Sequence, residues 1–269
     1  MTLDATSRDP RPSPVPVAAP PRIAARIESA PDGPVPVLHA GRDMVHLEVA
    51  GGAVGVAAAG APGLPHSLRT NLVSLSSSGV PTAYLDSGIL HLGGRALVVG
   101  RLVDVRAPRL DSARIPTASP AAVQGTPRSH GAGLVAGPGG VDIRHIDVRH
   151  IDPVAVAGLV GRGDGLTPFG DDVLCGWLAA HRAACVATQA VDDAVRRALP
   201  RTTTLSATLL ECALAGEVAD LAAGYLRALG TPSERAARAA LAALGHSSGE
   251  GLALGIDLGV AGLVGRVAA

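Results

Sequence analysis

Lysine is absent from this 269-residue sequence, so all 23 of its basic residues are arginines. A Schiff-base mechanism, a pyridoxal-phosphate anchor and a Walker-type phosphate loop each need a lysine amine, and the sequence therefore excludes all three. Aromatic residues are also scarce, at 1% of the chain. Because single-stranded nucleic acids bind largely by stacking bases on aromatic rings, we do not expect that mode of binding.

The sequence also lacks an excess of charge of either sign, because 23 basic residues balance 23 acidic ones. Without a basic field to attract phosphate backbones or anionic lipid, we expect neither a nucleic acid nor a membrane as a partner. No basic start followed by an apolar run marks a secretion signal, and the three cysteines show no CxxC spacing. These absences predict a cytoplasmic protein that binds a small polar ligand or another protein.

Composition divides the chain into three regions and predicts an α+β fold. Residues 1–33 are rich in proline, and we expect a disordered tail there. Residues 34–150 contain short Val- and Leu-rich runs separated by glycine, which predict a β-rich region. Residues 151–269 change to helical periodicity, and strands followed by helices are typical of α+β proteins.

Individual elements can be assigned by range. Strands are expected at 45–49, 54–58, 82–85, 89–92 and 96–103, with a short helix or strand at 66–73 and a loop at 111–141. Helices are expected at 153–160, 168–187, 191–199, 205–214, 218–229, 233–244 and 249–264. The last apolar stretch contains Asp257 and Arg266, so we interpret it as a core helix and not as a membrane span.

A glycine-rich loop precedes the second of these helices. Gly161, Gly163 and Gly165 alternate with other residues, which allows tight turns and close approach of the backbone to a ligand. Thr167 and Pro168 follow, and this pair predicts a helix start in which the threonine is the cap. Since a helix N-terminus favours negative charge, we expect a small anionic substrate with a phosphate or carboxylate group.

Two adjacent carboxylates, Asp171 and Asp172, fall in the second turn of the same predicted helix, which is otherwise almost entirely apolar. Buried carboxylates are costly unless they are paired, hydrogen-bonded or bound to metal. They could hold Mg²⁺, act as a general base or accept hydrogen bonds from a substrate. Alternatively, one of them caps a neighbouring helix or pairs with Arg162. Asp171 follows Thr167 by four residues, so both side chains are predicted on one helix face.

Two later helix starts are also rich in hydroxyl groups: Thr202-Thr203-Thr204 with Ser206, and His246-Ser247-Ser248, where Ser247 and Glu250 fit a capping box. All of these starts would form one polar pocket only if they converge. The candidate catalytic residues are Thr167, Asp171, Asp172 and His246, and the two aspartates are also the candidate metal ligands. The candidate substrate-binding residues are Asn71, Gly161, Gly163, Gly165, Thr203, Ser206, Ser247 and Ser248.

Two familiar motifs fail on their context. Gly245-x-Ser247-x-Gly249 matches a hydrolase nucleophile elbow, but the preceding segment is a predicted helix and no histidine follows. The alternating glycines suggest a dinucleotide fingerprint, but the third glycine comes one residue early and no clear strand leads into the loop. Neither a triad hydrolase nor a dinucleotide-binding enzyme is therefore expected.

The pattern Gly161-x-Gly163-x-Gly165-Leu166-Thr167-Pro168-x-Gly170-Asp171-Asp172 resembles the motif of the AllH-like subunit family of bacterial oxamate carbamoyltransferase. The two later hydroxyl-rich blocks, and His66-Ser67 with Asn71-Leu72, are similar to further blocks of that family, over roughly residues 40–265. The sequence departs from the family pattern at Phe169, where a small hydroxyl residue is expected, and at Glu250, where aspartate is expected.

The resemblance implies a subunit that works with partner subunits in carbamoyl transfer between carbamoyl phosphate and oxamate, in purine and allantoin degradation and nitrogen metabolism. Two alternatives stay open at this point. One is a non-catalytic metabolite-binding or assembly subunit, and the other is an Mg²⁺-dependent hydrolase that uses the aspartate pair. The departures at Phe169 and Glu250 bear on the identity of the substrate.

Overall fold

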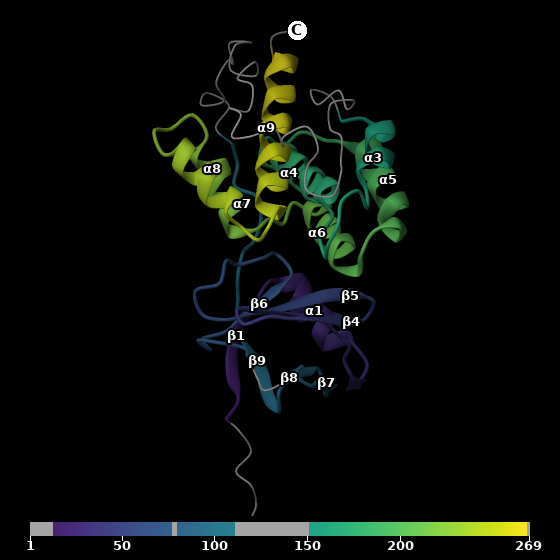
Figure 1. Ribbon diagram of the computed structural model, residues 1–269, viewed down its shortest axis with the longest axis vertical. Helices are drawn as coiled ribbons and strands as arrows, with labels where there is room; N and C mark the ends of the chain where they lie inside the picture. Colours follow the sequence, from purple (N-terminus) through teal and green to yellow (C-terminus); the bar gives the residue numbers. More distant parts are fainter. Residues whose placement is uncertain (1–12, 77–79, 111–150, 268–269) are drawn as a thin grey trace, which may run out of the picture. The chain divides into compact units, whose positions relative to one another are not determined.

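The computed structural model describes residues 13–76, 80–110 and 151–267, with side chains as far as Leu263. The described chain forms two compact units (Figure 1). Unit 1 contains the residues up to Ala50, Val54–Ala61 and Ser67–Val103, and unit 2 contains Gly51–Ala53, Pro62–His66 and the residues from Asp104 onward. The α+β class predicted from the sequence is confirmed, because strands dominate the first half and helices the second. The loop predicted at 111–141 lies outside the described residues.

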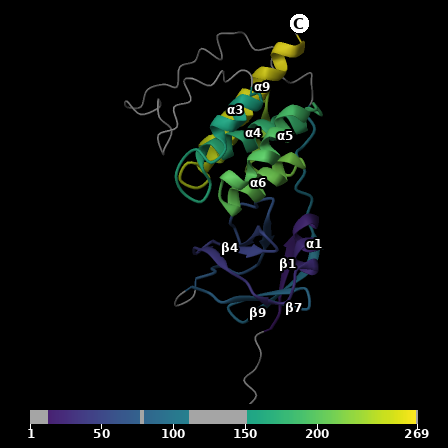
Figure 2. The same cartoon turned by 90° about the vertical axis from the view of Figure 1, so that its right-hand side faces the viewer.

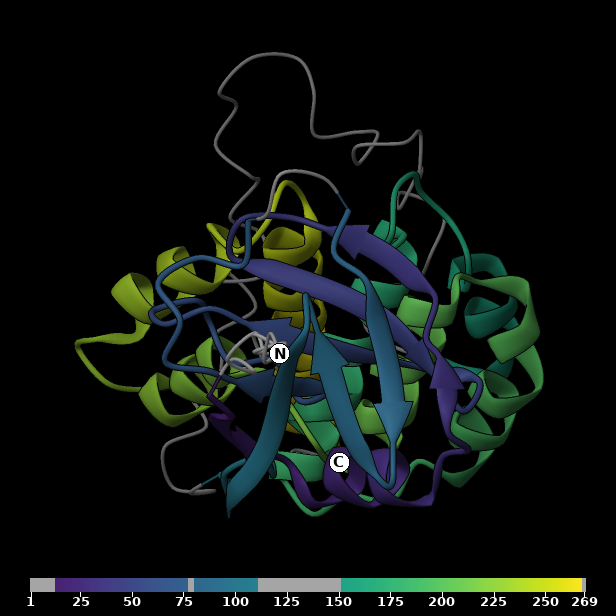
Figure 3. The same cartoon turned by 90° about the horizontal axis from the view of Figure 1, so that it is seen from below.

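Unit 1 is built on a β-sheet, whose strands are drawn as arrows in Figure 3. Within the described residues the sheet has nine strands, in the order β2-β7-β8-β9-β1-β6-β5-β4-β3. Their bounds are β1 Val15–Ala19, β2 Gly33–Pro34, β3 Val37–Ala40, β4 Met44–Val49, β5 Gly52–Ala57, β6 Ser67–Arg69, β7 Ala83–Asp86, β8 Ile89–Leu92 and β9 Arg95–Leu102. β1 runs parallel to β9 and β5 runs parallel to β6. The five strands predicted from Val- and Leu-rich runs correspond to β4, β5, β7, β8 and β9.

Residue alternation sets which side of the sheet is buried. In β7, Ala83 and Leu85 are buried while Tyr84 and Asp86 are exposed. Tyr84 is directly opposite His91 in β8, and the two rings stack with their centroids 4.3 Å apart. Because side chains alternate between the two faces of a strand, this register assigns Leu90 and Leu92 of β8 to the buried core.

The expectation of a disordered tail over residues 1–33 is wrong for much of that range. Residues 15–19 form β1, and α1 spans Pro21–Ser29. The sequence carries the signal for both elements, since Val15 and Val17 alternate as in a strand, and Ile23 and Ile27 are spaced one helical turn apart and buried. Burial of these four apolar side chains offsets the conformational entropy that is lost when this proline-rich segment becomes ordered. Residues 1–12 lie outside the described part.

Unit 2 consists mainly of helices (Figure 2). Each of the seven helices predicted from the sequence is present. Their bounds are α3 Pro153–Leu159, α4 Phe169–Ala183, α5 Gln189–Ala198, α6 Thr204–Leu214, α7 Asp220–Ala228, α8 Glu234–Ala242 and α9 Ser248–Val267, with the 3-10 helix η2 at Leu199–Arg201. The segment that precedes α3 in the described chain, residues 104–110, also belongs to unit 2. Val218 N donates a backbone hydrogen bond to Val105 O, and Ala107 N donates one to Gly216 O.

Both ends of α4 differ from their prediction. The helix begins at Phe169, and Pro168 occupies the cap position with a non-helical backbone, so Thr167 does not cap it. It ends at Ala183 instead of Ala187, because Cys185 adopts a φ of 58° that interrupts the helix. Cys185 is exposed, whereas Cys175 and Cys212 are buried as expected of small apolar residues.

Glycines allow α4 and α9 to pack with their backbones in close contact (Figure 1). A Cβ at position 255 of α9 would overlap the Val173 carbonyl oxygen and lie 2.8 Å from Trp177 N in α4. A Cβ at position 176 of α4 would likewise overlap the Leu252 carbonyl oxygen. The glycines that interrupt the last apolar stretch are thus needed for helix packing. Within the described residues, no helix is long and apolar enough to cross a membrane.

We expect Gly255→Ala to lower the free energy of unfolding by about 1–3 kcal/mol, because the added methyl group must force the two helices apart. Gly224→Ala is the matched control, since Gly224 lies inside α7 and a Cβ there would meet no atom within 4 Å. That substitution should raise the free energy of unfolding by about 0.5–1 kcal/mol. Chemical denaturation of both variants measures the two changes. Equal effects at the two positions would contradict the close packing of α4 on α9.

Candidate functional site

The hydroxyl-rich helix starts predicted from the sequence converge on the acidic pair. Asp171 and Asp172 both lie in the first turn of α4 and are 1% and 3% exposed. α4 packs against α6 on one side and α9 on another, so the start of each neighbouring helix reaches one of the two carboxylates. All members of this group, which we call the acidic cluster, belong to unit 2: Thr167, Asp171, Asp172, Thr202, Ser206 and Ser248.

Asp171 is fully engaged by hydrogen bonds from the protein itself. Its Oδ1 accepts from the backbone N–H of Gly161 at 2.9 Å, and its Oδ2 accepts from the Thr202 hydroxyl at 2.5 Å. Burial raises the pKa of this carboxyl, and the hydrogen bonds from Thr202, Gly161 and Ser206 act in the opposite direction. Asp171 therefore ties the glycine loop to the start of α6.

Asp172 is held differently and retains an unused oxygen. The Ser248 and Thr167 hydroxyls hydrogen-bond to its carboxyl group, and these two hydroxyls lie 2.6 Å from each other. Its Oδ2 is buried without a hydrogen-bond partner among the described residues. Burial raises the pKa of Asp172 well above its ordinary value, the neighbouring Asp171 charge raises it further, and the two hydroxyls lower it. A buried, unsatisfied carboxyl oxygen is costly and is typical of a position that meets a ligand or a proton.

The glycine loop is shaped by close contacts that only glycine permits. Gly161 has a φ of +74°, and a Cβ there would lie 2.5 Å from the carbonyl oxygen of Arg201. Gly163 has a φ of +115°, and a Cβ there would lie 2.6 Å from Phe169 N. Gly165 differs, because a side chain there would meet no atom within 4 Å. The first two glycines fix the loop against the helices, and the third leaves its backbone open to a ligand.

The start of α4 offers few free N–H groups for the expected anion. Gly170 N donates to Arg162 O, and Asp171 N donates to Pro168 O. Thr167, which was predicted to cap this helix and share a face with Asp171, instead lies beside Ser248 and Asp172. Two carboxylates in the first turn also complement the positive end of the helix dipole. The acidic cluster therefore suits an N–H donor better than a bare anion.

The remaining predicted site residues do not all belong to the acidic cluster. Thr203 caps α6, since its hydroxyl oxygen accepts from Ser206 N, and it donates to Leu166 O in the glycine loop at 2.6 Å. Ser247 is half-buried just before α9, and its carbonyl oxygen accepts from Gly251 N. His246 is exposed. Asn71 is exposed and lies in unit 1, whereas the acidic cluster consists of unit 2 residues alone.

Thr202 was not among the predicted site residues, although its hydroxyl donates to Asp171. Its signal was the run of three threonines, of which only Thr203 was predicted to bind substrate. Cys175, one turn after the acidic pair, is not a ready nucleophile, because burial and the nearby Asp172 and Asp171 charges raise the pKa of its thiol. The described residues contain no group of three or more His, Cys, Asp or Glu side chains arranged to hold a metal.

Burial of Asp172 predicts a stability change with pH. A native pKa above the unfolded value, near 3.8, means that the native state binds the proton more tightly, so stability is lost as pH rises from about 4 through the raised native pKa. Asp172→Asn removes this loss, and at neutral pH we expect its Tm to exceed that of the unchanged protein by at least about 2 °C. Thermal melts across pH measure the difference.

Asp193→Asn is the control for the removal of a charge, since Asp193 is a partly exposed residue on α5 that pairs with Arg196. It should leave the pH dependence of Tm nearly unchanged. If the Tm of Asp172→Asn runs parallel to that of the unchanged protein from acid to neutral pH, ionisation of Asp172 does not lower the stability of the folded state.

The part of this chain that matches a known protein family lies in unit 2. A family model described as "Oxamate carbamoyltransferase subunit AllH" matches residues 159–260, which is less than half of the chain. The matched segment contains the glycine loop and the acidic cluster, and it does not include Asn71. No curated protein and no solved structure matches the chain. The resemblance inferred from the glycine-loop motif is thereby confirmed, and over residues 159–260 the chain is AllH-like.

Proposed function

We propose that this chain is a subunit of a carbamoyltransferase-type enzyme that acts on oxamate, carbamoyl phosphate or a related small carboxamide in nitrogen metabolism. The family match over residues 159–260 supports the reaction class. The observation that carries the proposal is the buried Oδ2 of Asp172, which has no hydrogen-bond partner among the described residues. A substrate N–H group directed at this oxygen would satisfy it.

The proposed chemistry uses Asp172 as the base. As the acceptor nitrogen of oxamate bonds to the carbamoyl carbon, the carbon–oxygen bond to phosphate breaks, phosphate leaves, and a proton from the nitrogen passes to Asp172 Oδ2. A carboxyl with a raised pKa is a stronger base than an ordinary carboxylate, and the pKa of Asp172 is raised by burial. The half-buried hydroxyls of Thr167 and Ser248 lie beside the same carboxyl group, and their oxygens can accept a hydrogen bond from a further N–H group of the substrate.

Asp171 has a positioning role in this proposal. Its oxygens are engaged by Gly161 N and the Thr202 hydroxyl, so it holds the glycine loop against α6 and does not address the substrate directly. Thr203 reinforces the same contact through Leu166 O. The open backbone at Gly165 then borders the substrate. Partner subunits would supply further groups for the anionic parts of the substrate.

The first test measures carbamoyl transfer from carbamoyl phosphate to oxamate by the purified chain, alone and with the products of neighbouring genes. We expect little activity from the chain alone, because the family that its residues 159–260 resemble is one subunit of the enzyme, and full activity with its partner subunits. Full activity from the single chain would defeat the subunit part of the proposal. Partner binding in the absence of any carbamoyl transfer would favour the assembly-subunit alternative.

The second test uses the assembled enzyme with Asp172→Asn. Removing the base should reduce kcat by about 10²- to 10⁴-fold, while the variant stays folded, keeps its subunit association and melts no lower than the unchanged protein. Asp193→Asn, which removes a charge from α5, is the control and should keep full activity. An Asp172→Asn enzyme that turns over at the unchanged rate would show that the acidic cluster is not the reacting site. Activity that depends on added Mg²⁺ and hydrolyses the substrate would favour the hydrolase alternative.

A further inference from the structure

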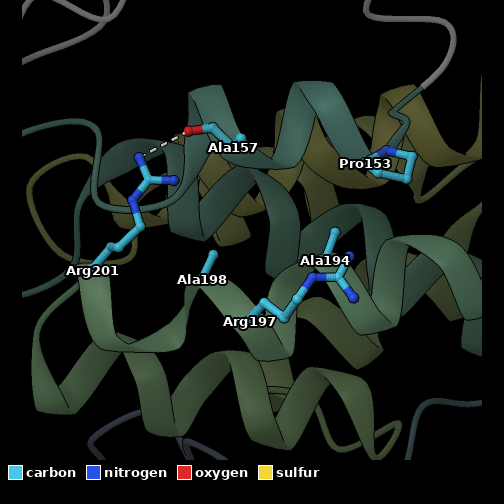
Figure 4. Close-up of a pocket in the computed structure, with 6 residues that line it drawn as sticks. All are labelled: Pro153, Ala157, Ala194, Arg197, Ala198 and Arg201. Atoms are coloured by element: carbon cyan, nitrogen blue, oxygen red, sulfur yellow. Dashed lines mark hydrogen bonds between the residues drawn. The ribbon is translucent and has the colours of Figure 1, made fainter.

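A separate pocket in unit 2 lies on the face formed by α3 and α5. It has a volume of about 190 Å³ and is lined by Pro153, Ala157, Ala194, Arg197, Ala198 and Arg201 (Figure 4). It is smaller than the pockets of about 300–1,000 Å³ that take drug-sized ligands. Its size therefore suits a small ion or a very small organic molecule.

Two guanidinium groups supply the charge of the pocket. Arg197 and Arg201 are four residues apart at the end of α5 and in η2, and both are exposed. In the part of the chain that the structure describes, neither forms an ion pair with an acidic side chain. Neighbouring Arg196, by contrast, pairs with Asp193 at 2.9 Å. Like charges at this spacing repel each other weakly, and an anion bound beside both guanidinium groups would remove this repulsion.

The other walls of the pocket are small and carry no negative charge. Ala157, Ala194 and Ala198 have small side chains, and Ala157 also presents its carbonyl oxygen to Arg201. Arg201 extends to the carbonyl oxygen of Ala157, to which its Nη2 donates at 3.0 Å, while Arg197 extends toward Ala194 (Figure 4). The bond to Ala157 fixes one guanidinium at the pocket and leaves its other N–H groups for a ligand.

From this geometry we propose that the Arg197–Arg201 pocket binds a small oxyanion with two negative charges, such as a phosphate group or a dicarboxylate. Arginine presents paired N–H groups that match phosphate and carboxylate oxygens, and charge-assisted hydrogen bonds of this kind are stronger than neutral ones. The pocket is distinct from the acidic cluster, whose carboxylates disfavour an anion. The two regions are nevertheless adjacent along the chain, because Thr202, which donates to Asp171, follows Arg201 directly.

Titration calorimetry of the full chain with inorganic phosphate, and separately with oxalate, tests this proposal. We expect saturable binding at one site per chain for at least one of the two anions, and the comparison of the two Kd values identifies which group is preferred. Arg197→Gln and Arg201→Gln should each raise Kd by about tenfold or more, since each removes a charge-assisted hydrogen bond. Arg196→Gln is the matched control and should leave Kd unchanged.

A second pair of variants tests the charge of the pocket without removing an arginine. Ala157→Glu places a carboxylate at the pocket on an exposed position of α3 and should abolish anion binding. Val154→Glu makes the same change of charge at another exposed position of α3 that does not line the pocket, and it should bind as the unchanged chain does. No saturable binding of either anion, or equal Kd values for Ala157→Glu and Val154→Glu, would overturn the proposal.

The proposal does not depend on the proposed carbamoyl transfer, and one variant separates the two. Asp172→Asn leaves both arginines in place and should bind the anion with the Kd of the unchanged chain. Anion binding that is lost in Asp172→Asn but kept in Arg197→Gln and Arg201→Gln would assign the anion to the acidic cluster and overturn the pocket assignment. Loss of transfer in Asp172→Asn with unchanged anion binding is the result expected when both proposals hold.

Discussion

Burial of two adjacent carboxylates at the start of α4 is the constraint on which the rest of unit 2 depends. A carboxylate removed from water must find donors, and the helix that carries this pair is apolar along nearly all of its buried length. The donors come from other segments: a backbone N–H of the glycine loop, hydroxyls at the start of α6, and a hydroxyl at the start of α9. The convergence of these helix starts therefore supplies the hydrogen-bond donors that the buried acidic pair requires.

This arrangement gives the two carboxylates different environments. Asp171 is satisfied at both oxygens by groups that also hold the loop in place, as expected of a structural carboxylate. Asp172 keeps a buried oxygen without a partner among the described residues, and its raised pKa reflects that deficit. Two neighbouring carboxyls with separate environments are a recurring way to divide positioning from proton transfer. Such a division is consistent with a stability cost retained for function.

Close packing of α4 on α9 holds the acidic cluster together. Because Gly255 and Gly176 let the two backbones touch, Ser248 at the start of α9 is brought beside Thr167. A side chain at either glycine would separate the helices, and the hydroxyl contact at their ends would be lost with the packing. Fold stability and site geometry in unit 2 thus rest on the same helix pair.

The sequence by itself determined the α+β class, the seven helices of unit 2 and the location of the acidic pair, because helical periodicity, glycine spacing and buried charge are local signals. The predicted disordered tail was wrong at β1 and α1, because the many prolines outweighed the strand spacing of Val15 and Val17 and the helical spacing of Ile23 and Ile27. The sequence also placed Thr167 as a cap of α4, although this hydroxyl serves Ser248 and Asp172. Only the tertiary structure decided which hydroxyl meets which carboxylate, since Thr202 and Ser248 lie far from the aspartates along the chain and become their neighbours only through helix packing.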